Sequence, residues 1–127
     1  MKITIQREAL LKPLQLVTSV VEQRQALPIL SHVLLQVDGD KLTLTGTDTE
    51  IELIGSARLA EPVERAYKMT LPGRKFLDIC RNLPGDAMLE LSEDRDRVLI
   101  KSGRSKFTLA VLSADEFPAV KDGEQTA

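Results

Sequence analysis

The chain has 127 residues, enough for one domain that buries its own core. Hydrophobic residues make up 43% and charged residues 28%, as in ordinary globular proteins, but aromatic residues make up only 3%, so the core must be aliphatic. The single cysteine, Cys80, excludes an internal disulfide, and without a signal peptide or an apolar run of about 20 residues we expect a cytoplasmic protein with Cys80 as a buried thiol.

The first half of the chain predicts one helix among four strands. Ile3 and Ile5 alternate with polar residues and predict a strand over residues 2–6. A helix is predicted over residues 8–21, with Pro13 inside it and an apolar face of Leu10, Leu14, Val17 and Val21. A loop covers residues 22–30, and turns containing Asp and Gly separate three further strands, over residues 32–37, 41–45 and 50–59.

The second half predicts the same order of elements. A strand over residues 66–71 ends at Pro72-Gly73. The helix that follows, over residues 74–82, has a core side of Phe76, Ile79, Cys80 and Leu83. Three strands complete the pattern, over residues 87–91, 97–101 and 105–112, and the periodicity fades from Ser113 onward.

The two halves also match in sequence. Residues 3–5 return as residues 69–71, 66 positions later, and residues 38–42 return as residues 94–98, 56 positions later. The second offset also places Ile51 and Leu53 on Phe107 and Leu109. A repeated β-α-β-β-β unit predicts an α+β fold with a pseudo-two-fold axis and two helices packed on one face of an antiparallel sheet. Because the offset falls from 66 to 56 across the helix, the second helix should be the shorter one.

Residues capable of catalysis are few. The chain has one histidine, one cysteine and no glycine-rich phosphate loop, so no metal or other cofactor is expected. A Ser-His-Asp site through His32 is conceivable, but we expect this residue to be a half-buried or surface histidine at the start of a strand. Asp48, Glu50 and Glu52 could ligate a metal, yet the alternation with Ile51 favours a solvated strand face opposite a buried one.

The net charge of −2 is unevenly distributed along the chain. Residues 7–25 carry a net charge of +1 and residues 74–82 carry +2, so the rest of the chain carries −5. Arg74, Asp78 and Arg81 share a stripe on the second helix, and Lys12 lies off the apolar face of the first. These are either ordinary solvated helix faces or one shared basic face, which would hold a phosphate backbone without reading its sequence.

Several motifs together point to one protein family. They are Met1–Ile5, Leu10–Leu14, Leu27–Leu30, Gly46–Asp48 with Glu50, Arg74–Phe76, Asp78–Arg81, Ser102–Ser105 and Phe117-Pro118. In order and spacing they closely resemble the N-terminal domain of the bacterial DNA polymerase III beta subunit, the sliding clamp. The resemblance covers the chain to about Val120.

The resemblance implies a clamp fold and a role in DNA replication. Subunits of this family have three domains of one fold, and two subunits join head to tail in a homodimeric ring around duplex DNA. The ring is a processivity factor that tethers DNA polymerase III and is loaded by a clamp loader. It is DNA-binding but not an enzyme, although the DNA-directed DNA polymerase that it serves is a nucleotidyltransferase, and it needs no cofactor.

The resemblance also implies roles for individual residues. Arg24, on the loop after the first helix, would contact DNA, and the other DNA-facing cations would be Lys12, Arg7, Arg74, Lys75 and Arg81. Phe107 and Leu109, on the last strand, would belong to the subunit interface. Their alternation with polar neighbours is equally typical of plain core residues.

The expected domain covers residues 1–120, with units over about residues 1–60 and 65–118, and residues 121–127 begin an interdomain linker. The family's pocket for polymerase and clamp-loader peptides would lie in domains beyond this chain. An alternative of another class is a stand-alone α+β module that binds proteins through its sheet edge.

Overall fold

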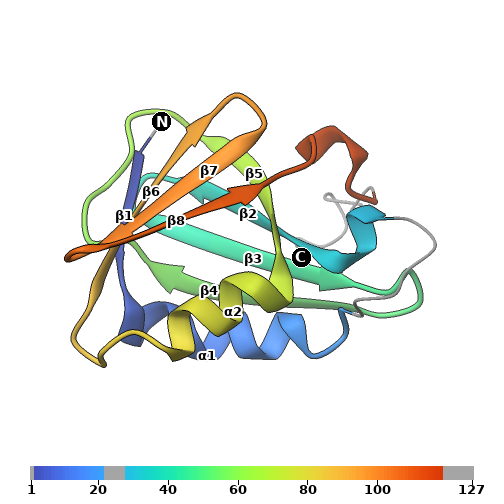
Figure 1. Cartoon of the computed structure of the whole chain (residues 1–127). Helices are drawn as coiled ribbons and strands as arrows, with labels where there is room; N and C mark the ends of the chain where they lie inside the picture. Colours follow the sequence, from blue (N-terminus) through green and yellow to red (C-terminus); the bar gives the residue numbers. More distant parts are fainter. Residues whose placement is uncertain (1, 22–27, 119–127) are drawn as a thin grey trace.

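A computed structural model describes residues 2–21 and 28–118, and the structural statements that follow concern these residues. Figure 1 shows two helices on one side of a group of strands. In chain order the elements are β1 (Lys2–Gln6), α1 (Arg7–Thr18), η1 (Pro28–Ser31), β2 (His32–Asp38), β3 (Lys41–Thr47), β4 (Glu52–Arg58), β5 (Tyr67–Pro72), α2 (Gly73–Arg81), β6 (Met88–Asp94), β7 (Arg97–Ser102), β8 (Ser105–Ala110) and η2 (Ala114–Glu116). The α+β class, the order of elements and the shorter second helix are confirmed.

The strands form two antiparallel sheets of four strands each, rather than the single sheet that the sequence predicted. Their orders are β1-β6-β7-β8 and β4-β3-β2-β5. The first strand of each half is exchanged: Ile3 of β1 lies opposite Leu91 of β6, and Met69 of β5 lies opposite Leu35 of β2. Met69 follows Ile3 by 66 residues and Leu91 follows Leu35 by 56, so the strand pairing repeats with the same offsets as the sequence. Because each sheet borrows one strand from the other half, neither half can form its sheet alone.

The last strands of the two halves do not follow the offset of 56. Ala57 lies opposite Leu42, and Leu109 lies opposite Val98, which is the equivalent of Leu42. Leu109 therefore matches Ala57 at an offset of 52, and the alignment at 56 was wrong for Phe107 as well. The cause is the longer connection between β3 and β4, which covers residues 48–51, whereas only residues 103 and 104 join β7 to β8.

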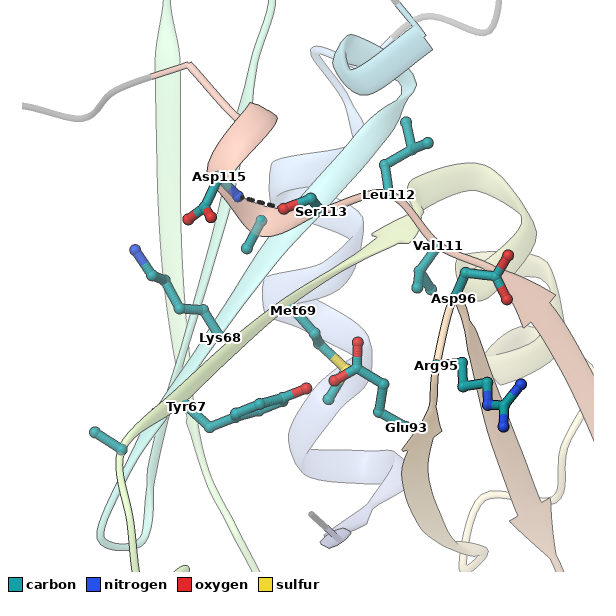
Figure 2. Close-up of a pocket in the computed structure, with 12 residues that line it drawn as sticks. Tyr67, Lys68, Met69, Glu93, Arg95, Asp96, Val111, Leu112, Ser113 and Asp115 are labelled. Carbon is teal, nitrogen blue, oxygen red and sulfur yellow. Dashed lines mark hydrogen bonds between the residues drawn. The ribbon is translucent and has the colours of Figure 1, made fainter.

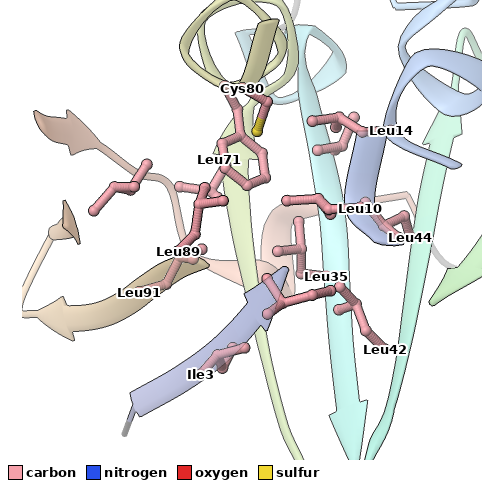
Figure 3. Close-up of a cluster of buried hydrophobic side chains, with 14 of the residues drawn as sticks. Ile3, Leu10, Leu14, Leu35, Leu42, Leu44, Leu71, Cys80, Leu89 and Leu91 are labelled. Atoms are coloured by element: carbon pink, nitrogen blue, oxygen red, sulfur yellow. The ribbon is translucent and has the colours of Figure 1, made fainter. Parts of the chain in front are cut away.

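One aliphatic core lies between the two sheets and the helices (Figure 3). The predicted apolar face of α1 is completely buried at Leu10, Leu14 and Val17, and so is Val21, although the helix ends at Thr18 rather than at residue 21. Phe76 and Cys80 of α2 are also completely buried. The helix faces read from the sequence are therefore confirmed except in α2, where the predicted core residue Ile79 is only half-buried and Leu77, which was not predicted, is buried.

Two glycines allow α1 to lie directly against one sheet. The helix continues through Pro13, and a Cβ atom added to Gly55 of β4 would come within 2.9 Å of the Pro13 Cβ atom. A Cβ atom added to Gly46 of β3 would overlap the main-chain oxygen of Val17. Phe107 occupies the position equivalent to Gly55, so the second half cannot repeat this close approach.

The chain after β8 crosses to the other sheet. Phe117 is buried in a second, smaller cluster with Ile29, Leu30 and Leu34. Leu34 lies on the opposite face of β2 from Val33 and Leu35, because side chains alternate along a strand. Residues 114–117, where the sequence showed no periodicity, therefore cover part of the outer face of the sheet β4-β3-β2-β5.

Candidate nucleic-acid interface

The exposed cations of the two helices gather on one layer of the molecule. α1 and α2 lie side by side (Figure 1). Each turns its charged residues away from its buried face. The exposed cations are Lys12 on α1 and Arg74, Lys75 and Arg81 on α2. Exposed carboxylates on the same helices are Glu8 and Asp78, so the helix layer is net basic on a chain whose total charge is −2.

Arg7 differs from these four cations because it joins the helices to each other. Only 17% of its side chain is exposed. Its Nε atom donates a hydrogen bond of 3.0 Å to the carbonyl oxygen of Cys80, and its Nη1 atom lies 3.8 Å from Glu8 Oε1. Burial raises the pKa of the Cys80 thiol to about 12, against the opposing effect of the Arg7 charge, so the thiol stays protonated.

Arg74 contacts the chain that follows α1. Its Nη2 atom donates to the carbonyl oxygen of Val21 at 3.5 Å, while the side chain as a whole is exposed. Val21 directly precedes residues 22–27, so Arg24 itself lies outside the described residues. Lys12, Arg74, Lys75 and Arg81 are thus the predicted DNA-facing residues that the structure brings together.

The predicted interface residues lie on a free sheet edge. β8 pairs with β7 on one side only and ends its sheet. Leu109 is buried in the main core, whereas Phe107 is half-buried and packs against the same core. The core interpretation therefore describes Leu109, and Phe107 is the side chain of this pair that reaches the surface.

His32 is buried, contrary to the expectation of a half-buried or surface histidine. Its side chain lies under the chain after β8, and its Nδ1 atom is 3.1 Å from Thr70 Oγ1. The Thr70 hydroxyl donates to the carbonyl oxygen of Leu112 at 2.9 Å, so His32 Nδ1 is the donor to Thr70. Burial lowers the pKa of His32. Sequence reasoning missed this network because its three members lie far apart in the chain.

The acidic segment after β3 is a turn. Asp48 Oδ1 accepts hydrogen bonds from the main-chain N–H groups of Glu50 and Ile51, both at 2.9 Å, and these bonds lower the pKa of Asp48. Ile51 is 48% exposed, so the predicted alternation of buried and solvated residues was wrong there: the strand begins only at Glu52. Among the described residues, no group of three His, Cys, Asp or Glu side chains is placed to hold a metal.

A comparison with known families decides the identity. Residues 1–121 match the family model described as "DNA polymerase III beta subunit, N-terminal domain". The chain belongs to this family. No helix in residues 2–21 and 28–118 is long and apolar enough to cross a membrane.

Relatives in the beta subunit family are similar along almost the whole chain. The beta sliding clamp of Pseudomonas putida is 56% identical over 123 residues, which cover 97% of this chain and 33% of the relative. The beta sliding clamp of Escherichia coli K12 is 47% identical over 96% of this chain and 33% of the relative. This chain thus spans about one third of the length of the curated relatives that it matches.

Solved structures of the beta subunit family have the same fold. A sliding clamp from Pseudomonas aeruginosa, solved with griselimycin bound, superposes with a TM-score of 0.90 at 52% identity, covering 95% of this chain and 32% of that structure. A Caulobacter crescentus pol III beta structure superposes with a TM-score of 0.87 at 42% identity, covering 94% of this chain and 32% of that structure.

Proposed function

We propose that this chain is the N-terminal domain of a replicative sliding clamp. The complete clamp is a ring that encircles duplex DNA in the cytoplasm and tethers DNA polymerase III during chromosomal replication. It catalyses no reaction and needs no cofactor or metal. Residues 1–120 form the domain, as units over about residues 1–60 and 65–118, and residues 121–127 begin the linker to further domains, outside the described residues.

The observation that carries this proposal is the single basic layer formed by α1 and α2. Four exposed cations, Lys12, Arg74, Lys75 and Arg81, are held on two adjacent helices whose opposite faces are locked into the core. Such cations attract phosphates at any position along a duplex, because the phosphate backbone is chemically the same whatever the base sequence. Arg24 would add a further phosphate contact, and Arg7 would act mainly by holding the helices together.

The ring requires a second subunit and further partners. The free edge of β8 offers unpaired main-chain groups to a strand of another subunit, and Phe107 lies half-buried at that edge. We propose that Phe107 and Leu109 belong to this head-to-tail interface. Polymerase III and the clamp loader would bind through domains beyond this chain.

The alternative is a stand-alone interaction module that uses its sheet edge. It is favoured by the same free edge of β8, but it gives no role to the cations of the helix layer. The two functions therefore differ in what the helix cations do.

Charge reversal on the helix layer tests the proposal. We expect Arg74→Glu with Arg81→Glu to weaken binding of the chain to a fluorescent duplex by at least about tenfold at low salt, because each cation lost removes a phosphate contact. The matched control is Lys41→Glu with Arg97→Glu, two exposed cations on the sheets, which should change binding less than about twofold. Equal losses from both double variants would contradict the proposal.

A further inference from the structure

The chains that leave β4 and β8 begin in the same way. The Leu59 N–H group donates to the carbonyl oxygen of Asp40 at 2.7 Å, and the Val111 N–H group donates to the carbonyl oxygen of Asp96 at 2.9 Å. Asp96 follows Asp40 by 56 residues, and Val111 follows Leu59 by 52, which are the offsets that relate the two halves. The two segments are pseudo-symmetric copies at this point.

The first copy fills the space beside it. The Ala60 N–H group donates to the carbonyl oxygen of Thr4 on β1, and the Val63 N–H group donates to the carbonyl oxygen of Gly39 in the turn between β2 and β3, both at 2.8 Å. The Val63 side chain packs against the main core. Residues 59–63 thus bridge the free edge of β1 and the neighbouring turn.

The second copy turns away from the equivalent space. Asp115, which matches Val63 by position, donates its N–H group to Ser113 Oγ at 3.2 Å instead of to a turn carbonyl. Phe117 and Ala114 then pack with Ile29 and Leu30 of η1. Among the described residues, none takes the place that Val63 has in the first half.

A cleft of about 600 Å³ lies at this place (Figure 2). Its base contains the buried side chains of Met69 and Val111 and the half-buried ring of Tyr67. Figure 2 shows Glu93 of β6 on the other wall, with its carboxylate directed toward Met69 and Tyr67. The cleft therefore combines an apolar base with a carboxylate at its side.

The wall opposite β5, formed by Glu93, Arg95 and Asp96, offers a carbonyl oxygen as a hydrogen-bond acceptor and two carboxylates. Arg95 has a φ of 62° and its equivalent Gly39 a φ of 61°, so the two turns have the same conformation at this residue. In the first half the Gly39 carbonyl oxygen accepts the hydrogen bond from the Val63 N–H group. Glu93 stands where the first half has Val37, and burial raises its pKa. Three carboxylates, Glu93, Asp96 and Asp115, and two cations, Lys68 and Arg95, line the cleft. Its lining is therefore net negative and favours an occupant that carries a cation on the side of Glu93.

We propose that this cleft binds an extended peptide segment of a partner protein, with a small aliphatic residue in the place of Val63 and a basic residue beside Glu93. A main-chain N–H group of the peptide bonds to the Arg95 carbonyl, as Val63 bonds to Gly39 in the first half. The aliphatic side chain covers Met69 and Tyr67. No residue of α1 or α2 lines the cleft, so the proposal goes beyond the proposed function and does not depend on it.

A peptide copied from the chain itself tests the proposal. The probe is an acetylated peptide of residues 58–65, Arg-Leu-Ala-Glu-Pro-Val-Glu-Arg, titrated into the isotope-labelled chain of 127 residues and followed by NMR. We expect shift changes confined to residues of the cleft, including Tyr67 and Arg95. A control peptide with Val63→Asp should bind at least about tenfold more weakly, because its carboxylate meets an apolar base and a second carboxylate.

Variants of the chain make the test specific. Tyr67→Ala should weaken binding of the probe at least about fivefold through the loss of apolar contact, and Ala66→Arg, at an exposed residue of the rim, should block the cleft without disturbing the core. The matched control Gln36→Ala, at an exposed residue of β2, should leave binding unchanged. The proposal is overturned if millimolar peptide causes no chemical-shift changes, or if the changes fall on α1 or α2. It is also overturned if both peptides bind equally, or if the shifts depend only on the concentration of the chain and not on that of the peptide.

Discussion

Arg7 Nε donates a 3.0 Å hydrogen bond to the carbonyl oxygen of Cys80, and this bond ties the first turn of α1 to the last turn of α2. The guanidinium thereby places positive charge at the C-terminal end of α2, where helix carbonyls favour it. Arg7 is thus a structural residue, whereas Lys12, one turn further along α1, is exposed and has no such bond among the described residues.

The contrast between Arg7 and Lys12 can be measured. We expect Arg7→Ala to lower the free energy of unfolding by about 1–3 kcal/mol, because the Cys80 carbonyl loses its hydrogen-bond donor and the largely buried Arg7 side chain loses its packing contacts. Lys12→Ala should change the free energy of unfolding by less than about 0.5 kcal/mol. Urea denaturation of both variants gives the comparison, and equal losses would show that Arg7 does not hold the helices together.

The turn between β6 and β7 carries avoidable strain. Arg95 adopts the positive φ that Gly39 adopts in the equivalent turn, and a side chain raises the energy of this conformation. We expect Arg95→Gly to raise the free energy of unfolding by about 0.5–1 kcal/mol. Arg97→Gly, two residues later in regular strand, should lower it by about the same amount, and a loss of stability in both variants would contradict this reading of the turn.

The close contact of α1 with β3 leaves no room for a side chain at Gly46. We expect Gly46→Ala to lower the free energy of unfolding by about 1–3 kcal/mol, since the new methyl group overlaps the main-chain oxygen of Val17. Gly85→Ala is the matched control, because a Cβ atom there meets only Arg7 Nη1, at 3.9 Å. Thermal unfolding of the two variants should separate them, and similar melting temperatures would argue against the tight helix contact.

The burial of His32 makes stability depend on pH. In the folded chain its pKa lies below the usual value of 6.5, so as the pH falls through 6.5 the unfolded chain takes up a proton that the folded chain does not. The free energy of unfolding should therefore decrease between pH 6.5 and the pKa of the folded state. Glu93, whose pKa burial raises, acts in the opposite direction.

Replacement of the only histidine isolates this effect. In His32→Gln the decrease in the free energy of unfolding between about pH 7 and pH 5.5 should be smaller than in the unmodified chain, whatever the absolute stability of the variant. Denaturant titrations at a series of pH values give the slope. If the free energy of unfolding changes equally with pH in both proteins, the protonation of His32 does not contribute to the pH dependence.

Local periodicity accounts for what the sequence predicted correctly. The spacing of Leu10, Leu14 and Val17 depends only on helix geometry, and the repeated residues 3–5 and 69–71 mark the start of each unit. Strand exchange was not predictable in this way, because the pairing of Ile3 with Leu91 joins residues from different halves of the chain. Two sheets therefore replaced the single sheet.

The predicted site shows the same division between local and distant causes. The exposure of Lys12, Arg74, Lys75 and Arg81 followed from helix faces. The bond from Arg7 to Cys80 spans 73 residues, and nothing near Arg7 in the sequence distinguishes it from a solvated cation. His32 is buried and bonds to Thr70, whose hydroxyl bonds to the Leu112 carbonyl, and the segment around Leu112 has no periodic pattern that would predict where it lies.

The central proposal is that this chain forms the first of three domains in one subunit of a two-subunit ring, which is held on DNA by its closure. The direct measurement uses a chimera in which residues 1–121 replace the matching segment of the Pseudomonas putida relative, loaded by a clamp loader onto nicked circular DNA. We expect the chimera to stay on the circle during gel filtration and to leave within minutes once the circle is cut, because weak phosphate contacts let a closed ring slide. Equal retention, or equal loss, on circular and linear DNA would contradict the account.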